Sequence, residues 1–297
     1  MSQSEKHRIQ QHFDAKAICY ESSAVLQRNV CKELLQRLDL TNIKPSVVLD
    51  VGCGTGWGTQ DLLKKYKKAK VLSLDLSPEM LKQTKSKGGW LRKPALICAD
   101  AEDIPLQDES VDLIFSNLML QWCDYKKVFA EFKRLLKPDG LLMFSTFGPD
   151  TLKELKKSWE QVDSHAHVND FTDMHDLGDE LIQAGLAEPV MDMDLLTLTY
   201  QDVKSVMLDL KSIGANTILK NQKKAVEQGL VTPGKLKRVI THYEKYRKNG
   251  VIPASYEIVY GHAWKTIQRE SKVSQEGRVA GEFSIAVEQI KNKQTKS

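Results

Sequence analysis

The sequence lacks the features of membrane and secreted proteins. Its 297 residues contain no apolar run that approaches the ~18 residues of a membrane span, and the first residues, MSQSEKHRIQQHF, contain no apolar signal region. The five cysteines are odd in number and scattered, without a Cys-x-x-Cys pair. Such cysteines indicate free thiols in a reducing compartment rather than a disulfide framework or a zinc site. We therefore expect a cytoplasmic protein with no membrane partner.

Clusters of metal-ligating residues are also missing. The seven histidines include the close pair His165 and His167, but no cysteine and no third histidine lies near them in the sequence. We therefore expect no metal site. With 41% apolar and 28% charged residues, the composition is that of a soluble globular protein. The length suffices for one large core, or for one core with a small lid.

One glycine-rich stretch carries the most information. Residues 47–58 read VVLDVGCGTGWG. This pattern predicts a buried parallel strand that ends in a tight turn, followed by a helix that opens near Trp57. Glycine suits such a turn because the backbone takes positive φ values and a ligand can approach closely. A dinucleotide fingerprint would require a further glycine where Trp57 stands.

Strand and helix patterns alternate along most of the chain. Alternation of this kind predicts right-handed crossovers and a mostly parallel sheet with helices on both faces, with the ligand site at the carboxyl ends of the strands. The predicted strands are 47–51, 71–76, 95–99, 111–116, 140–147, 194–200 and 255–264. The predicted helices are 60–67, 78–87, 128–136 and 176–184, and residues 8–38 are expected to be mostly helical.

The expected domain organisation is a single domain over residues 1–264. Within it we expect a helical amino-terminal region (8–40), a cofactor-binding core (45–148), a lid and substrate or partner region (150–250) and a last strand (255–264). Residues 265–297 are polar and lysine-rich, and predict a weakly ordered tail with one short helix near Ile285. The segment 211–250 contains ten lysines and arginines but only two acidic residues.

Asp75 ends the second predicted strand. A carboxylate at this position can accept both hydroxyl groups of an adenosine ribose, as in dinucleotide sites. The alternative is a charge that faces the dipole of the following helix, for which Ser77 is the expected N-cap. Asp100 follows the third strand, where it is either a ligand-binding acid or a solvated turn residue.

Several stretches resemble one enzyme family. The pattern D-x-G-x-G-x-G at residues 50–56 resembles motif I of class I S-adenosylmethionine methyltransferases. Four further stretches are similar to the malonyl-[acyl-carrier protein] O-methyltransferases of biotin synthesis. They are FDAKAICYESSAVLQR (13–28), DLSPEM (75–80), SNLMLQWC (116–123) and LKSIGANT (210–217). The resemblance covers residues 8–264, and the tail after Trp264 departs from the family.

This resemblance implies a Rossmann-like class I methyltransferase fold, with S-adenosylmethionine as cofactor. It implies that Asp100 and the following backbone N–H read the adenine edge, and that Asn117 faces the methionine end of the cofactor. The cofactor-binding residues implied are Asp50, Gly52, Cys53, Gly54, Gly56, Asp75, Leu76, Asp100, Ala101 and Asn117.

The resemblance also implies a substrate and a partner. A free carboxyl group has a pKa near 4, so it arrives ionised and serves as the nucleophile, and we expect no catalytic base. The candidates for orienting the substrate are Tyr20, Trp122, Lys211 and Arg28, each of which also has an explanation as a packing or surface residue. The implied partner is malonyl-carrying acyl carrier protein, and the basic segment Lys211–Lys248 is the candidate docking surface.

Three alternatives remain open at this point. The first is a methyltransferase for a free small acid such as aconitate. The second is a nucleic-acid methyltransferase, suggested by the pI of 8.6. It is disfavoured because Leu118 and Met119 follow Asn117, in place of an Asn-Pro-Pro-aromatic signature, so we expect no nucleic-acid partner. The third is a non-catalytic assembly factor that retains the methyltransferase fold.

Overall fold

A computed structural model of the chain describes residues 2–18, 20–89, 92–212 and 232–266. Residues 1–266 form one compact unit. The expected tail helix near Ile285, residues 213–217 of LKSIGANT and residues 213–231 of the basic segment lie outside the described residues. In the part of the chain that is described, no helix is both long and apolar enough to cross a membrane.

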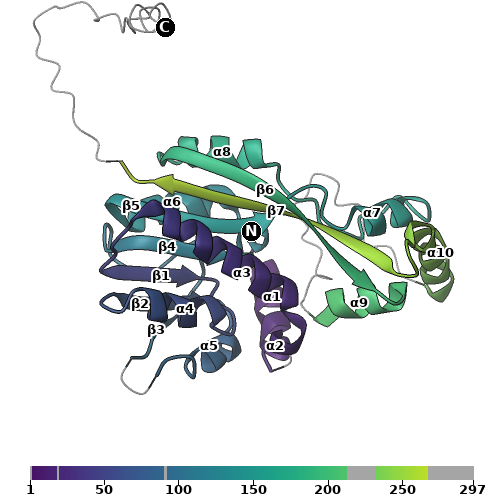
Figure 1. Ribbon diagram of the computed structural model, residues 1–297, viewed down its shortest axis with the longest axis horizontal. Helices are drawn as coiled ribbons and strands as arrows, with labels where there is room; N and C mark the ends of the chain where they lie inside the picture. Colours follow the sequence, from purple (N-terminus) through teal and green to yellow (C-terminus); the bar gives the residue numbers. More distant parts are fainter. Residues whose placement is uncertain (1, 19, 90–91, 213–231, 267–297) are drawn as a thin grey trace, which may run out of the picture. The chain divides into compact units, whose positions relative to one another are not determined.

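A seven-stranded sheet runs through this unit in the order β3-β2-β1-β4-β5-β7-β6 (Figure 1). Neighbouring strands from β3 to β5 are parallel, whereas β7 is antiparallel to both β5 and β6. This topology confirms the predicted fold class, a Rossmann-like, mostly parallel sheet. The strands are β1 (Val47–Val51), β2 (Lys70–Asp75), β3 (Ala95–Cys98), β4 (Val111–Asn117), β5 (Leu136–Phe147), β6 (Ala187–Tyr200) and β7 (Ile252–Trp264).

Helices cover both faces of the sheet because side chains alternate along each strand. On β1, for example, Val48 belongs to one buried cluster and Leu49 to the other. The first cluster includes residues of α3 and α4, and the second includes residues of α6 and α8. These helices are α3 (Val25–Leu38), α4 (Trp57–Lys65), α6 (Tyr125–Leu135) and α8 (Met174–Gln183).

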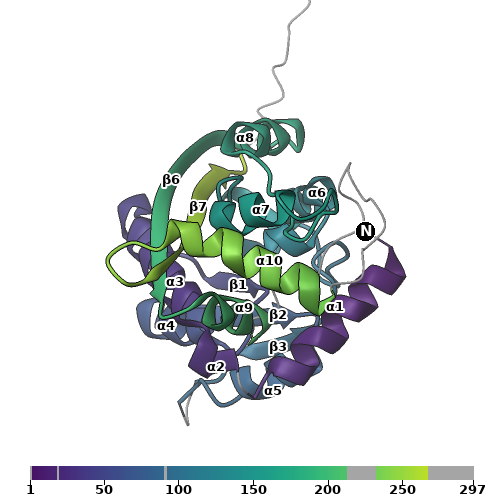
Figure 2. The ribbon, with the colours of Figure 1, turned by 90° about the vertical axis from the view of Figure 1, so that its right-hand side faces the viewer.

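The remaining helices include those at the carboxyl ends of the parallel strands. Figure 2 looks onto this end, where α1, α2, α7, α9 and α10 lie in front of the strands. The helices not yet given are α1 (Gln3–Lys16), α2 (Tyr20–Ser23), α5 (Pro78–Thr84), α7 (Lys153–Glu160), α9 (Val203–Ser212) and α10 (Pro233–Tyr243). Three short 3-10 turns are η1 (Asp39–Thr41), η2 (Leu120–Trp122) and η3 (Glu244–Tyr246).

Some element boundaries differ from the sequence prediction. Strand β6 begins at Ala187 rather than at residue 194, and β7 begins at Ile252 rather than at 255. The two strands pair along nearly their whole length, and exposed residues alternate with partly buried ones along β6, which lies at the sheet edge. Val190 and Leu195 are apolar but exposed, and Asp194 is partly buried, so the alternation of exposure does not show in the sequence as an alternation of polar and apolar residues.

The ends of three helices were also wrong in the prediction. Helix α6 ends at Leu135, and β5 already begins at Leu136, because Leu136 takes an extended conformation. Helix α5 ends at Thr84 rather than at residue 87, and α4 ends at Lys65 rather than at 67.

One polar cluster connects two of the helices at the carboxyl end of the sheet. The Nε2 atom of His167 lies 2.8 Å from Oδ1 of Asp163, and Nζ of Lys235 on α10 lies 2.9 Å from Oδ2 of the same carboxylate. The His167 ring stacks on Trp159 of α7 at 3.5 Å between ring centroids. Burial would raise the pKa of Asp163, but the hydrogen bonds from Lys235 and His167 outweigh it and lower that pKa. The cluster therefore fixes α10 against α7.

Candidate active site

The glycine turn joins β1 to α4 and is held by the neighbouring strand. The backbone N–H groups of Gly52 and Cys53 both donate to the carbonyl of Leu74, over 2.8 and 3.0 Å. Gly52 and Gly54 take φ values of +70° and +54°, which glycine adopts without strain. A Cβ atom at Gly54 would meet no protein atom within 4 Å, so this part of the turn borders open space.

Asp75 lies at the end of β2, directly beside this turn. Its Oδ2 accepts the backbone N–H of Gly54, and its Oδ1 accepts the backbone N–H of Ser77, each over 2.8 Å. Burial raises the pKa of Asp75 to about 6. The carboxylate is thus fixed in orientation, and each oxygen retains a lone pair for a ligand hydroxyl.

Two adjoining cavities border the turn. The first extends from Gly54 and Asp75 past Asp100 and Ala101 to Trp122. The second extends from the turn towards Asp50 and Cys53 and to Arg28 and Trp57. They share five lining residues, which are Tyr20, Gln27, Gly52, Gly54 and Asn117.

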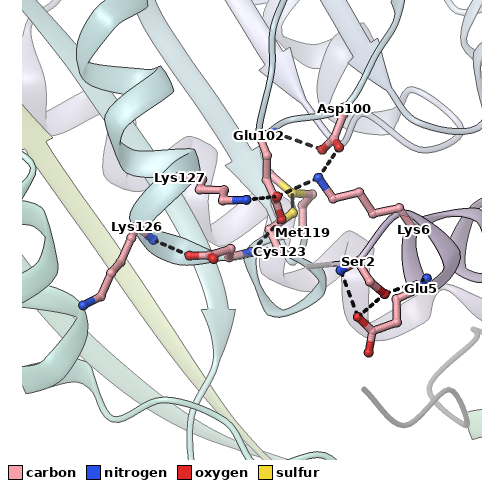
Figure 3. A network of polar contacts seen from close by, with 10 residues as sticks. Ser2, Glu5, Lys6, Asp100, Glu102, Met119, Cys123, Lys126 and Lys127 are labelled. Carbon is pink, nitrogen blue, oxygen red and sulfur yellow. Dashed lines mark hydrogen bonds and ion pairs between the residues drawn. The ribbon is translucent and has the colours of Figure 1, made fainter. Parts of the chain in front are cut away.

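Asp100 lines the first cavity and belongs to a network of charges (Figure 3). Lys6 of α1 forms ion pairs with Asp100 and with Glu102, the latter over 2.6 Å. Burial alone would lower the pKa of Lys6, but its contacts with Asp100 and Glu102 outweigh burial and raise that pKa. Oδ1 of Asp100 accepts the backbone N–H of Glu102 over 2.9 Å. Helix α1 is therefore fastened over the first cavity by its lysine.

Asn117 is the last residue of β4, and both polar atoms of its side-chain amide form hydrogen bonds. Its Nδ2 donates to the backbone carbonyl of Gln27 over 3.1 Å, and its Oδ1 accepts the Ser145 hydroxyl over 3.0 Å. The first of these bonds fastens α3 to the end of the central strand. Asn117 therefore fixes the wall that the two cavities share.

Aromatic side chains line part of the first cavity. The ring of Phe13 packs edge-on against Trp122 and Tyr20, at centroid distances of 5.5 and 6.4 Å. Phe147 of β5 also lines this cavity. Burial raises the pKa of Tyr20 far above its usual value, so its hydroxyl stays protonated at neutral pH and can donate a hydrogen bond but cannot serve as a base.

The predicted cofactor-binding residues fall almost entirely along the two cavities. Nine of the ten line one or both of them, and the exception is Gly56. Gly56 is the N-cap of α4, and a Cβ atom there would lie 2.9 Å from both Thr84 and Lys87. Its φ of +86° and this close packing explain the glycine without a ligand.

The four candidates for orienting the substrate lie at different places in the structure. Tyr20 lines both cavities, Trp122 the first and Arg28 the second. Lys211 lies exposed on α9 and lines neither cavity.

The sequence prediction missed several residues of the first cavity. Lys6 and Ile9 come from α1, and Gln121 and Phe147 come from η2 and β5. A signal for α1 was present, because Ser2 and Glu5 form a capping box that starts the helix at Gln3. A helix start does not reveal what the helix covers, so the packing of Lys6 on Asp100 was not predictable from it.

Histidines and metal-binding groups do not contribute to the described site. His165 and His167 belong to the Asp163 cluster and line neither cavity. Among the described residues no group of three His, Cys, Asp or Glu side chains is placed to hold a metal ion.

Comparison with known proteins identifies the family. Residues 49–144 match the family model described as a methyltransferase domain. A malonyl-[acyl-carrier protein] O-methyltransferase from Gallionella capsiferriformans is 48% identical over 275 residues, which cover 90% of this chain and 93% of that protein. A protein of the same name from Laribacter hongkongensis is 46% identical and covers 94% of this chain and 96% of its own length. The chain belongs to the malonyl-[acyl-carrier protein] O-methyltransferase family.

Solved structures support the same fold for this O-methyltransferase. The YcgJ protein from Bacillus subtilis aligns with 79% of the chain and 98% of its own length, at a TM-score of 0.54 and 17% identity. A SAM-dependent methyltransferase from Thermotoga maritima covers 87% of the chain and all of its own length, at a TM-score of 0.51 and 18% identity. At these identities the likeness concerns the fold alone.

The residues present fit S-adenosylmethionine, the cofactor of this methyltransferase. The open space beside Gly54 lies where a ligand can approach the backbone, next to the fixed carboxylate of Asp75. The turn contains no lysine for a pyrophosphate, in agreement with a nucleoside that carries no phosphate.

Proposed function

We propose that the protein transfers the methyl group of S-adenosylmethionine to the free carboxylate of a malonyl group on acyl carrier protein, at the start of pimeloyl formation for biotin. The observation that carries this function is the identity of 44–48% over about 90% of the chain with relatives of that name. The same observation disfavours a free small acid such as aconitate as the substrate.

The two cavities divide the binding of the cofactor between them. In the proposal Asp75 holds the ribose hydroxyls, Asp100 and the backbone after it face the adenine, and Gly54 lets the ligand approach the turn. When bound, S-adenosylmethionine supplies an electrophilic methyl group on a sulfonium. Through its ion pair with Asp100, Lys6 covers the part of the first cavity that would hold the adenine. The rings of Phe13 and Trp122 would exclude water from the same cavity.

The substrate needs no general base in this reaction. Its carboxyl group is ionised at neutral pH and is itself the nucleophile. The task of the protein is then to bring the carboxylate oxygen to roughly 3 Å from the methyl carbon, in line with the sulfur. Tyr20 is the hydroxyl donor at the junction of the cavities, and because it stays protonated it can orient the second carboxylate oxygen.

Methylation removes the negative charge of the malonyl group, and this changes which pockets the group can enter. A malonyl carboxylate is charged, and burial of an unpaired charge in the apolar pockets of chain-elongating enzymes is costly. A methyl ester is neutral and resembles the end of a short acyl chain. Methylation therefore lets the modified group enter pockets that reject the free acid.

We further propose that exposed cations on α10 and after it dock the carrier protein. Two basic residues of the predicted docking segment form ion pairs within the protein, since Lys235 pairs with Asp163, and Arg247 pairs with Glu244 over 2.7 Å. Arg238 donates one hydrogen bond, over 3.4 Å, to the backbone carbonyl of Gln161. The side chains of Lys237, Arg238 and Lys245 are exposed. Carrier proteins of fatty-acid synthesis are generally strongly acidic, and opposite charge speeds encounter and fixes register.

Charge reversal tests this docking surface. The double variant Lys237→Glu and Arg238→Glu should raise the KM for malonyl carrier protein severalfold at low salt, and the increase should shrink as salt screens beyond ~10 Å. The matched control reverses Lys67 and Lys68, which are exposed and precede β2, a strand next to the edge strand β3. A malonyl thioester of a small pantetheine should be affected little. Equal losses with both substrates would assign the segment a structural role.

Two further parts of the proposal concern organisation. Residues 8–40 close the cofactor cavities, residues 45–148 bind the cofactor, and residues 150–250 with the strand 255–264 serve the substrate and partner. We also propose a cytoplasmic location, supported by the free state of Cys31, Cys53, Cys98 and Cys123.

A panel of acceptors tests the function as a whole. The protein is incubated with S-adenosylmethionine labelled in the methyl group and with malonyl carrier protein, aconitate or RNA in separate reactions. Label should enter the malonyl carrier protein alone. Transfer to aconitate or RNA would support the corresponding alternative, and the absence of transfer to every acceptor would support a non-catalytic role.

A further inference from the structure

Helix α9 has an outward face on which two cations flank an apolar side chain. Lys204, Leu208 and Lys211 are all exposed, and their spacing of four and then three residues places them on one side of the helix. Leu208 is 67% exposed. Neither lysine forms an ion pair or a side-chain hydrogen bond with another residue in the part of the chain that the structure describes. The face therefore combines exposed apolar surface with free positive charge.

The opposite face of α9 is packed into the protein. Val203, Val206 and Leu210 are buried and belong to the same apolar cluster as residues of α10 and β7. At the side of the helix, Asp209 accepts a hydrogen bond from the hydroxyl of Tyr200, the last residue of β6, over 2.7 Å. Packing and this bond fix the helix in place, so its outward face can bind a partner without a change in the fold.

Helix α9 lies between the cavities and the exposed cations of α10. It contacts α2, whose first residue, Tyr20, lines both cavities. It also contacts α10, on which Lys237 and Arg238 are exposed. Figure 2 shows α2, α9 and α10 together at the carboxyl ends of the parallel strands. A partner bound to α9 is therefore placed beside the cations of α10 and beside the helix that borders the cavities.

We propose that the outward face of α9 is the centre of the docking surface for malonyl carrier protein. Leu208 packs against apolar side chains of an acidic helix of the carrier, and Lys204 and Lys211 pair with carboxylates of that helix. This inference rests on the proposed function. It extends the docking surface beyond the predicted basic segment, which begins at Lys211, and it assigns Lys211 to the carrier rather than to the substrate carboxylate.

The arrangement of charge and apolar surface on this face fits a helix of an acidic protein. Protein interfaces place apolar contacts at the centre and polar contacts around them, and here Leu208 lies between the two lysines. About 10 Å of helix separates Lys204 from Lys211. Carboxylates two turns apart on a partner helix have the same spacing, so both pairs can form while the leucine is covered.

Two other occupants fit this face less well. A nucleic acid would gain from the lysines but not from Leu208, because its affinity comes mainly from phosphate contacts. In a two-fold pair of this chain the same patch meets itself, so the lysines of one α9 would lie against those of the other and repel them. An acidic protein partner gains from both the charges and the leucine.

Steady-state kinetics of the full chain with two substrates test the charges of this face. The double variant Lys204→Glu and Lys211→Glu should raise the KM for malonyl carrier protein about tenfold or more at low salt, because attraction becomes repulsion. The increase should shrink as salt screens beyond ~10 Å. The kcat should change by less than about twofold, since this face does not touch the reacting atoms. Turnover of a malonyl thioester of a small pantetheine should be unaffected, because that substrate lacks the protein surface.

Replacement of Leu208 separates the apolar contact from the charges. Leu208→Ser should raise the KM for malonyl carrier protein about fivefold, the scale expected when part of an apolar side chain is no longer buried. This increase should persist at high salt. The matched control is Leu40→Ser in η1, where the leucine is 82% exposed and precedes β1. The conservative double variant Lys204→Arg and Lys211→Arg keeps both charges and should keep the KM.

The outcomes separate this inference from the proposed function. If the α9 variants impair both substrates equally, the face has a structural role or Lys211 orients the substrate, and the inference is wrong. An unchanged KM for malonyl carrier protein in these variants means that the carrier docks elsewhere, which also overturns the inference. If light scattering shows that Leu208→Ser dissociates a dimer, the face binds a second copy instead. Failure of the unmodified protein to methylate malonyl carrier protein would contradict the proposed function itself.

Discussion

Oδ2 of Asp75 accepts the backbone N–H of Gly54 over 2.8 Å. This bond joins the end of β2 to the middle of the glycine turn, so the two most informative motifs of the sequence form one unit. The second oxygen of the carboxylate accepts the N–H of Ser77 at the start of α5. Asp75 therefore fixes the turn and the helix while it faces the first cavity.

Replacement of Asp75 tests the ribose assignment. Asp75→Ala should weaken S-adenosylhomocysteine binding by about a hundredfold or more, since two charge-assisted hydrogen bonds are lost, each worth about 1.5–3 kcal/mol. Calorimetric titration measures the loss. The matched control is Asp14→Asn, because Asp14 accepts the Ser77 hydroxyl over 2.5 Å but lines neither cavity. An unchanged dissociation constant in Asp75→Ala would contradict the assignment.

A side chain at Gly54 should block the ligand while sparing the fold. Gly54→Val places its side chain in the open space beside the turn, so binding of S-adenosylhomocysteine should be abolished. A valine at the positive φ of this position should cost about 1–2 kcal/mol of folding stability, measured as a lower Tm. Gly250→Val is the matched control, since Gly250 has a φ of +80° and open surroundings, but lines neither cavity. The control should lose comparable stability and keep full binding; equal binding by both variants would contradict the account.

Cofactor affinity should depend on pH through Asp75. Burial raises the pKa of Asp75 to about 6, and hydroxyl groups of the ribose favour the ionised form. Affinity for S-adenosylhomocysteine should therefore be constant above about pH 7 and fall by up to about tenfold per pH unit below pH 6. Burial also raises the pKa of Asp50 to about 7, so Asp50→Asn is the control. Disappearance of the decline below pH 6 in Asp50→Asn would show that Asp50, and not Asp75, causes it.

The methyl-transfer step should show no catalytic base. With both substrates saturating, the single-turnover rate should be flat between about pH 6 and pH 9, because the nucleophile is already ionised. Tyr20 stays protonated in this range, and His165 and His167 lie in the Asp163 cluster. A bell-shaped profile that loses one limb on replacement of His165, His167 or Tyr20 would contradict this mechanism.

Patterns within short stretches allowed much of the fold and the cofactor site to be predicted. Asp75 and Asn117 end buried strands and Gly54 lies in the turn after another, and the carboxyl ends of neighbouring parallel strands meet at one edge. Local sequence was therefore sufficient to bring them together. The positions of Lys6 and Arg28 were not predictable in this way, because each depends on how a helix packs across the sheet. Nothing near Lys6 in the sequence indicates its contact with Asp100.

The central claim concerns the atom that receives the methyl group. The most direct measurement is mass spectrometry of malonyl carrier protein after incubation with the protein and S-adenosylmethionine, with fragmentation of the ejected pantetheine arm. The account predicts that one methyl group is added, as an ester at the terminal carboxyl of the malonyl unit. An unmodified malonyl unit, or a methyl group on any other atom of the carrier, would contradict it.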